Sequence, residues 1–274
     1  MEILQQSAIK NFAIDVATLK DEIFVLGTQD QRSHDYAIYV YDRIDMADVK
    51  DAIQLPEGTP LSLDACNASN CVYMVHRRFT VTISRITRDD DNQFQISSMI
   101  SGLYLPNPTL SVTANGDLIL SRRRGEDRAV INVYSATGVL QNEMNVPMYI
   151  SRLRQIVPKS NGNIVLISAQ KVQWQICHTR LTEIDVTGTV VSEHMTDFQF
   201  LHTNLSHADR YGRMIVTHNR GSRISLFDSH FNLLQVEDMM IDEYFQMCHY
   251  NSERNEIVGI NDRNVLFVFR FIDQ

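Results

Sequence analysis

The sequence predicts an all-β protein built from one repeated four-stranded unit. Segments of four to eight residues alternate β-branched or aromatic side chains with polar ones, as at 37–41 and 130–134, and clusters of turn-forming residues separate them. No helical period of ten or more residues is present, and 45–53 is the one segment in which we expect a short helical turn. These segments recur in the same order along the whole chain, so we expect a repeat architecture.

The clearest copy of the repeat runs from 110 to 141. It contains four strand-like segments, and the sequences Asn115-Gly116-Asp117 and Ala136-Thr137-Gly138 form two of its turns. A second copy extends from about 205 to 234, and four further copies fit the same template. The chain therefore contains six units, at a spacing of roughly 45 residues.

The two ends of the chain complement each other in this pattern. The sixth unit stops after its third strand, at Phe271, whereas a surplus strand-like segment from Ile3 to Ile9 precedes the first unit. A ring of blades that pairs these two segments would hide its sheet edges. We therefore expect a six-bladed β-propeller, one domain over residues 1–274, whose N-terminal strand completes the last blade. An open stack of six units is the alternative, and the surplus strand disfavours it.

Composition and charge limit the possible partners. Hydrophobic residues make up 44% and charged residues 21%, which predicts a folded chain. The apolar runs fall far short of the ~20 residues that span a bilayer, and the N-terminus lacks the pattern of a signal peptide. We expect a cytoplasmic protein without a membrane partner. Because the net charge is −8, binding of an anion would require basic residues gathered on one surface.

Cysteines are too few for a disulfide scaffold. Cys66 and Cys71 flank a four-residue turn and could face each other across a hairpin. In a cytosolic protein we expect both to be reduced, and a disulfide is the alternative.

Three segments resemble the NHL-repeat family of six-bladed propellers. They are Leu-Ser-Val-Thr-Ala-Asn-Gly-Asp-Leu-Ile-Leu at 110–120, His-Ala-Asp-Arg-Tyr-Gly-Arg-Met-Ile-Val-Thr at 207–217, and Asn-Arg-Gly-Ser-Arg-Ile-Ser-Leu-Phe-Asp at 219–228. The other blades share only the spacing, and with 11 glycines the usual glycine-rich loop starts are mostly absent. The resemblance implies a diverged member that binds RNA or protein, as do the propellers at the C-terminus of TRIM-type ubiquitin ligases. No RING or B-box pattern is present, so ligase chemistry is not implied. One tryptophan and no Trp-Asp pair argue against a WD40 propeller.

Basic residues recur in the loops that join the second and third strands of each unit. In a propeller these loops share one face, so an acidic chain would still have a basic surface that attracts anions. Arginine binds phosphate and carboxylate groups through its planar fork. The alternative is that surface loops are simply charged and that the distribution of sign is accidental. The predicted partner-binding residues are Arg32, His76, Arg77, Arg78, Arg122, Arg123, Arg124, Arg128, Lys171, Trp174, Arg220, Arg223 and Arg263.

We therefore predict a non-enzymatic recognition module for an anionic partner, either single-stranded RNA or an acidic protein segment. Trp174, Tyr104 and Tyr149 could stack on bases or anchor a peptide, although the tyrosines could equally be packing residues between blades. A protein-interaction scaffold that uses the rim or the opposite face is the alternative. The sequence leaves the oligomeric state open.

An axial-metal propeller hydrolase or lyase is the least favoured alternative. An axial metal in a propeller would need carboxylate or imidazole ligands from the innermost strands of several blades. The candidates are Asp15, Asp64, His207, Asp209 and His249. Histidines on such strands are more often hydrogen-bonded core residues than ligands. No zinc-protease, nucleophile-elbow or phosphate-loop motif is present, so we expect no enzyme activity, cofactor or metal.

Overall fold

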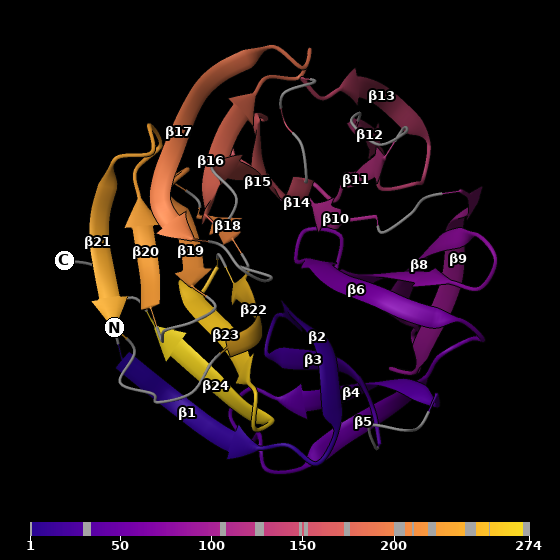
Figure 1. The fold of residues 1–274 in the computed structure, drawn as a ribbon. Helices are drawn as coiled ribbons and strands as arrows, with labels where there is room; N and C mark the ends of the chain where they lie inside the picture. Colours follow the sequence, from indigo (N-terminus) through magenta and orange to yellow (C-terminus); the bar gives the residue numbers. More distant parts are fainter. Residues whose placement is uncertain are drawn as a thin grey trace. The chain divides into compact units, whose positions relative to one another are not determined.

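The computed structural model describes residues 2–29, 34–104, 108–123, 129–147, 150, 153–172, 176–199, 206–209, 211–218, 223–238, 245–251 and 253–270. The described strands form six sheets, each with four antiparallel strands in sequential order except where β1 joins the last strands of the chain (Figure 1). This is the architecture of a six-bladed β-propeller, as the sequence predicts. Within it the chain divides into two compact units of three blades each. The prediction of a single domain stays a prediction.

Unit 1 comprises residues 1–105, 114–116 and 245–274. Its blades are β2 (Phe12–Leu19), β3 (Glu22–Thr28), β4 (Tyr36–Asp42) and β5 (Val49–Gln54); β6 (Thr59–Cys66), β7 (Cys71–Arg77), β8 (Val81–Arg88) and β9 (Phe94–Leu103); and β22 (Phe245–Asn251), β23 (Glu256–Asn261), β24 (Val265–Arg270) and β1 (Glu2–Ala8). The inner strand β2 packs against the inner strands β6 and β22 of the other two blades.

Unit 2 comprises residues 106–113 and 117–244. Its blades are β10 (Leu110–Val112), β11 (Leu118–Arg123), β12 (Ala129–Tyr134) and β13 (Leu140–Asn145); β14 (Leu153–Pro158), β15 (Ile164–Val172), β16 (Ile176–Ile184) and β17 (Val190–Gln199); and β18 (Ser206–Ala208), β19 (Met214–His218), β20 (Arg223–Phe227) and β21 (Leu233–Asp238). The inner strand β14 packs against β10 and β18.

The predicted closure by the N-terminal strand is confirmed. Strand β1 pairs antiparallel with β24, from Glu2 opposite Arg270 to Ala8 opposite Val265, with one register shift between Ile3 and Gln5. The sheet order is β1-β24-β23-β22, so β1 supplies the fourth strand of the blade that ends the chain.

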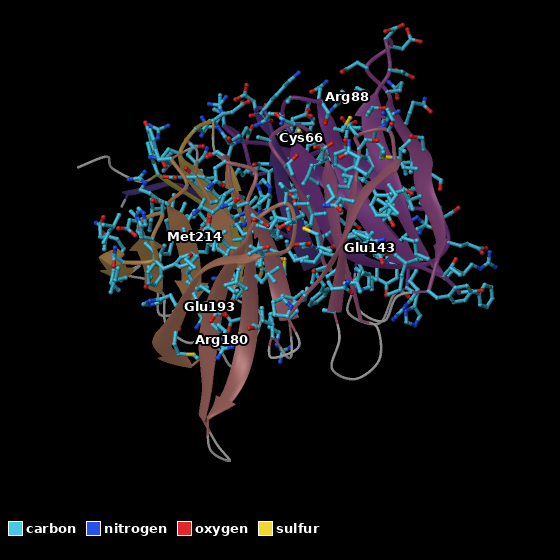
Figure 2. The ribbon with its side chains drawn as sticks, turned by 90° about the horizontal axis from the view of Figure 1, so that it is seen from above. Cys66, Arg88, Glu143, Arg180, Glu193 and Met214 are labelled. Atoms are coloured by element: carbon cyan, nitrogen blue, oxygen red, sulfur yellow. The ribbon has the colours of Figure 1, made fainter. Side chains whose placement is uncertain are left out.

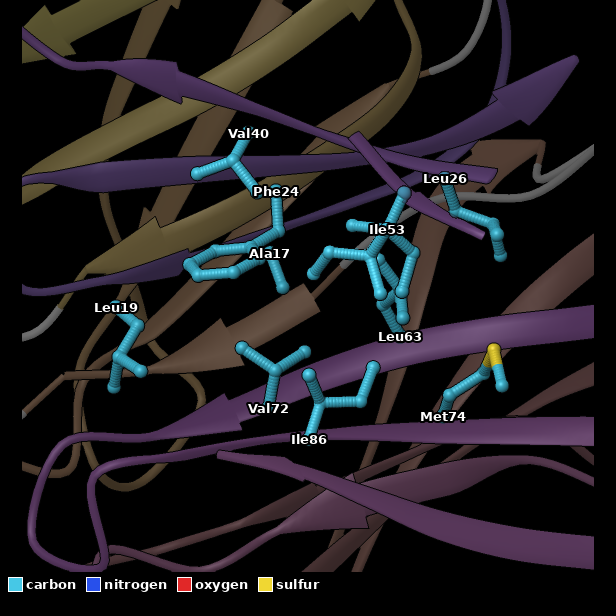
Figure 3. Close-up of a cluster of buried hydrophobic side chains, with 11 residues drawn as sticks. Ala17, Leu19, Phe24, Leu26, Val40, Ile53, Leu63, Val72, Met74 and Ile86 are labelled. Atoms are coloured by element: carbon cyan, nitrogen blue, oxygen red, sulfur yellow. The ribbon is translucent and has the colours of Figure 1, made fainter. Parts of the chain in front are cut away.

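Burial explains why the strands of one blade differ in sequence. Every residue of β23 is buried, whereas the outer strand β13 buries only Met144. Between the β2–β5 and β6–β9 blades, side chains such as Phe24, Val72 and Met74 form a continuous core (Figure 3). Unit 2 has two comparable cores. Such interdigitated apolar side chains are the main source of stability in a blade architecture.

The helical turn expected at 45–53 is wrong. Residues Val49–Gln54 form strand β5, which pairs with β4 and buries Ile53 alone. Because an outer strand exposes most of its side chains, it carries little of the alternation that identifies a strand.

Candidate binding surface

The structure describes only some of the residues predicted to bind a partner. Arg32, Arg124, Arg128, Trp174 and Arg220, together with Tyr149, lie outside the described residues. The backbone, but not the side chain, is described for Arg122 and Arg123 in β11, Lys171 in β15 and Arg223 in β20. The four residues with described side chains all lie in unit 1, and they are His76, Arg77, Arg78 and Arg263.

These four residues lie at one end of the unit 1 blades. Arg77 ends β7 and Arg78 follows it in the β7–β8 turn, whereas Arg263 is exposed in the β23–β24 turn. Both turns join the second and third strands of their blades, so strand direction places them at the same end of the unit. We call this end the β7–β8 end, and the end with the β6–β7 and β2–β3 turns the β6–β7 end.

Gly58, directly before β6, allows the backbone to pass close to the end of β7. Gly58 has a φ of 140°, and a Cβ atom there would lie 3.2 Å from the carbonyl oxygen of Arg77 and 3.3 Å from Nδ1 of His76. A side chain would therefore be strained and crowded at this position. The close approach places Glu57 beside Arg78, and their side chains form a 2.7 Å ion pair in which both remain well exposed.

Two aromatic rings stand exposed in the same blade. Phe79 in the β7–β8 turn is 86% exposed, and Tyr104 directly after β9 is 85% exposed. Val81, which begins β8 just after Phe79, pairs with Leu103, which ends β9 just before Tyr104. The two rings are therefore attached to adjacent strand ends. The Arg78 guanidinium carbon lies 5.6 Å from the Phe79 ring centroid. Tyr104 is therefore not a packing residue, which leaves it available to contact a partner.

Phe79 was not predicted from the sequence. A single aromatic residue in a turn adds nothing to strand periodicity, and the signal that could have found it is its place between Arg77-Arg78 and the start of β8.

The basic residues at this end are not equivalent. His76 is half-buried, its Nε2 lies 3.0 Å from Oγ of Ser84, and burial lowers its pKa. His76 is therefore neutral at pH 7 and adds no charge. Arg77 is half-buried and makes no ion pair among the described residues, so its charge is available to an anion.

Several acidic residues at the β6–β7 end form ion pairs with basic residues. The carboxylate of Glu22 binds Lys50 at 2.7 Å and Arg88 at 2.8 Å, and Asp21 binds Arg254. The buried Glu256 accepts from Arg43 at 3.1 Å and from Arg270 at 2.8 Å. Figure 2 shows Arg88 and Cys66 toward this end of their blade. The charges of Glu22, Asp21 and Glu256 are therefore each balanced by a basic side chain.

The inner strands of unit 1 bring together three of the five predicted axial candidates. His249 on β22 lies with Nε2 3.2 Å from Oδ1 of Asp64 on β6 and with Nδ1 3.0 Å from Oγ1 of Thr18 on β2. Asp15 on β2 accepts the backbone N–H groups of Val16 at 2.9 Å and Leu63 at 2.8 Å. The cluster thus ties three blades together through side chains.

Burial, opposed by those two N–H groups, raises the pKa of Asp15 to about 7, with the Asp64 charge adding to the increase. The other two candidates lie in unit 2, where Asp209 binds the Nε of Arg213 at 2.5 Å and His207 lies in β18. Among the described residues, no group of three or more His, Cys, Asp or Glu side chains could hold a metal ion.

Comparison with known proteins supports the fold and no more. No protein-family model matches the chain, and no curated protein matches it. A solved structure of a protein of unknown function from Bacteroides caccae is similar with a TM-score of 0.58 and 11% identity, over 82% of this chain and 78% of that one. Because 1196 solved chains match, the likeness does not single out an activity. In the described part of the chain, no helix is long and apolar enough to cross a membrane.

Proposed function

We propose that this chain is a non-enzymatic recognition module that binds single-stranded RNA through the β7–β8 end of unit 1. The observation that supports this proposal is the pair of exposed rings, Phe79 and Tyr104, next to Arg77 and Arg78. The basic residues predicted in the equivalent loops of unit 2 would serve the same function.

The chemistry of this end suits RNA better than an acidic protein segment. Single-stranded nucleic acids are bound by basic side chains that contact phosphates and by aromatic rings that stack on bases. An acidic segment would use the arginines, but the side chains of Asp and Glu have no ring that could stack on Phe79 or Tyr104. Arg78 is partly neutralised by Glu57, so Arg77 is the described residue best placed to contact a phosphate.

We also propose that the chain is a diverged NHL-like propeller and that it acts in the cytoplasm. Cys66, Cys71 and Cys248 are free thiols, which is the usual state of cysteines in that compartment. A protein-interaction scaffold that uses another surface is the competing function.

The test measures binding of a fluorescent single-stranded RNA to the purified chain by anisotropy at several salt concentrations. Arg77→Ala should reduce the slope of log K against log salt by about 0.7, the value for one lost phosphate contact on a single strand. Phe79→Ala should leave the slope unchanged and weaken binding about tenfold, since stacking one base contributes ~1–3 kcal/mol.

Matched controls come from outside this surface. Lys20→Ala removes one exposed positive charge at the β6–β7 end, and Tyr211→Ala removes a ring that is 61% exposed in unit 2. Neither should change binding. If an acidic peptide of equal charge binds as tightly as RNA and Phe79→Ala has no effect, the partner is an acidic protein segment. Binding that none of the variants alters would support the scaffold function.

A further inference from the structure

Two cysteines face each other at the end of one hairpin in unit 1. Cys66 ends β6, Cys71 begins β7, and the two residues are direct partners in the β6–β7 register. Only residues 67–70 separate them, and a turn closed by the Asn70 N–H donating to the Asn67 carbonyl at 3.1 Å connects the strands.

This register places the two thiols within reach of each other. Directly opposed residues of an antiparallel pair have Cα atoms about 4.5–5.5 Å apart. A disulfide requires a Cα separation of roughly 4.4–6.8 Å. The register therefore gives Cys66 and Cys71 a Cα separation that is compatible with a disulfide.

The thiols make separate contacts in the reduced state. Sγ of Cys66 donates to the carbonyl oxygen of Ala114 at 3.5 Å, and Sγ of Cys71 donates to that of Ser69 at 2.9 Å. We propose that Cys66 and Cys71 are a modification site, a dithiol that a hydroperoxide converts into an intramolecular disulfide. This proposal is independent of RNA binding.

The reaction balances with the hydroperoxide as the only co-reactant. One thiolate attacks a peroxide oxygen, which breaks the O–O bond and gives a sulfenic acid and, with hydrogen peroxide, one water. The second thiol then displaces the sulfenic oxygen as a second water, and the S–S bond forms. The two sulfurs together lose two electrons, and the peroxide gains them.

The burial of Cys66 and Cys71 slows the oxidation, but it does not change the expected product, which is the disulfide. Each cysteine is 3% exposed, and buried thiols react slowly because the oxidant must reach a thiolate. Access requires a local opening of the structure that exposes one of the sulfur atoms. Once one sulfur is oxidised, the partner thiol lies directly across the hairpin from it. The disulfide removes the donation from Cys66 to Ala114, so oxidation also releases a contact of this hairpin.

Peptide mapping tests the proposal on the intact wild-type chain. The chain is exposed to hydrogen peroxide at a dose that fully oxidises free glutathione, then denatured, treated with maleimide and cleaved with trypsin. The peptide 51–77 contains both cysteines and no internal Lys or Arg. We expect it to be lighter by two hydrogen atoms and to carry no maleimide, and to take up two maleimides after reduction with dithiothreitol.

Two variants separate this pair from other thiols. Cys71→Ser should abolish the two-hydrogen loss, whereas Cys248→Ser, which removes another buried thiol, should leave it unchanged. The proposal is overturned if the wild-type peptide still takes up two maleimides after peroxide. Sulfinic or sulfonic acid at either cysteine, in place of the disulfide, overturns it equally.

Discussion

The two ends of unit 1 carry similar types of residue in different states. At the β6–β7 end, Arg43, Arg88 and Arg254 all contact carboxylates, and one of these carboxylates, Glu256, is buried. At the β7–β8 end, Arg77 has no ion-pair partner among the described residues. The difference shows that the number of charges in a loop overstates how many are available to a ligand, because a charge with an internal partner is already compensated.

The largest expected change in stability comes from breaking the ion pairs of Glu256 at the β6–β7 end. Glu256→Gln should lower the free energy of unfolding by about 3 kcal/mol, because the mostly buried Arg43 would lose its buried carboxylate partner, which it shares with the half-exposed Arg270. Urea unfolding measures the change. Glu253→Gln, an exposed change three residues earlier, should cost less than about 0.5 kcal/mol. Equal effects of the two variants would show that pairing at this end is not structural.

An intermediate change in stability depends on pH and comes from Asp15 on the inner strand β2. The pKa of Asp15 is raised from 3.8 to about 7, so the native state holds a proton that the unfolded chain releases. The stability from this proton is fully present below about pH 4 and is lost as pH rises through 7.

Asp15→Asn removes this titration. From pH 5 to pH 8 the difference in urea midpoint between variant and wild type should therefore move in favour of the variant. The control is Asp185→Asn in an exposed turn, where hydrogen bonds from Thr187 lower the pKa. Its carboxylate is ionised in both states over this range, so the difference should stay constant. A constant difference for Asp15→Asn as well would contradict the raised pKa.

The smallest expected change in stability concerns the ion pair between Glu57 and Arg78 at the β7–β8 end. Glu57→Gln removes the exposed partner of Arg78 and should change the free energy of unfolding by less than about 1 kcal/mol. If RNA binds at this end, its affinity should rise a few-fold in the anisotropy measurement, because a second arginine becomes available. Weaker binding would mean that Glu57 positions Arg78 instead of competing with the ligand.

The sequence predicts the blades well because their inner strands must bury apolar side chains in a fixed order. The closing pair of β1 and β24 follows from the same count of strands. Strand β5 was missed because it buries one residue, Ile53, and an exposed strand has no reason to alternate. Sequence reasoning thus succeeds where burial restricts the residue types.

The candidate site is less predictable because it depends on which side chains meet. The sequence singled out Asp64 and His249, but Thr18, the second partner of that imidazole, becomes apparent only when β2 and β22 are adjacent. Likewise, the basic character of Arg78 is visible in the sequence, whereas its neutralisation by Glu57 depends on the bend at Gly58.

The pairing of β1 with β24 has a consequence for how the protein is made. Strand β1 is translated well before its partner β24, which follows roughly 15–50 s later at ~5–20 residues per second. During synthesis the first strand has no sheet to join. Pairing it with β24 closes a loop that runs from Ala8 to Val265, which makes this step slow compared with the formation of individual hairpins. The nascent chain thus exposes a free strand at the stage when chaperones are most able to bind it.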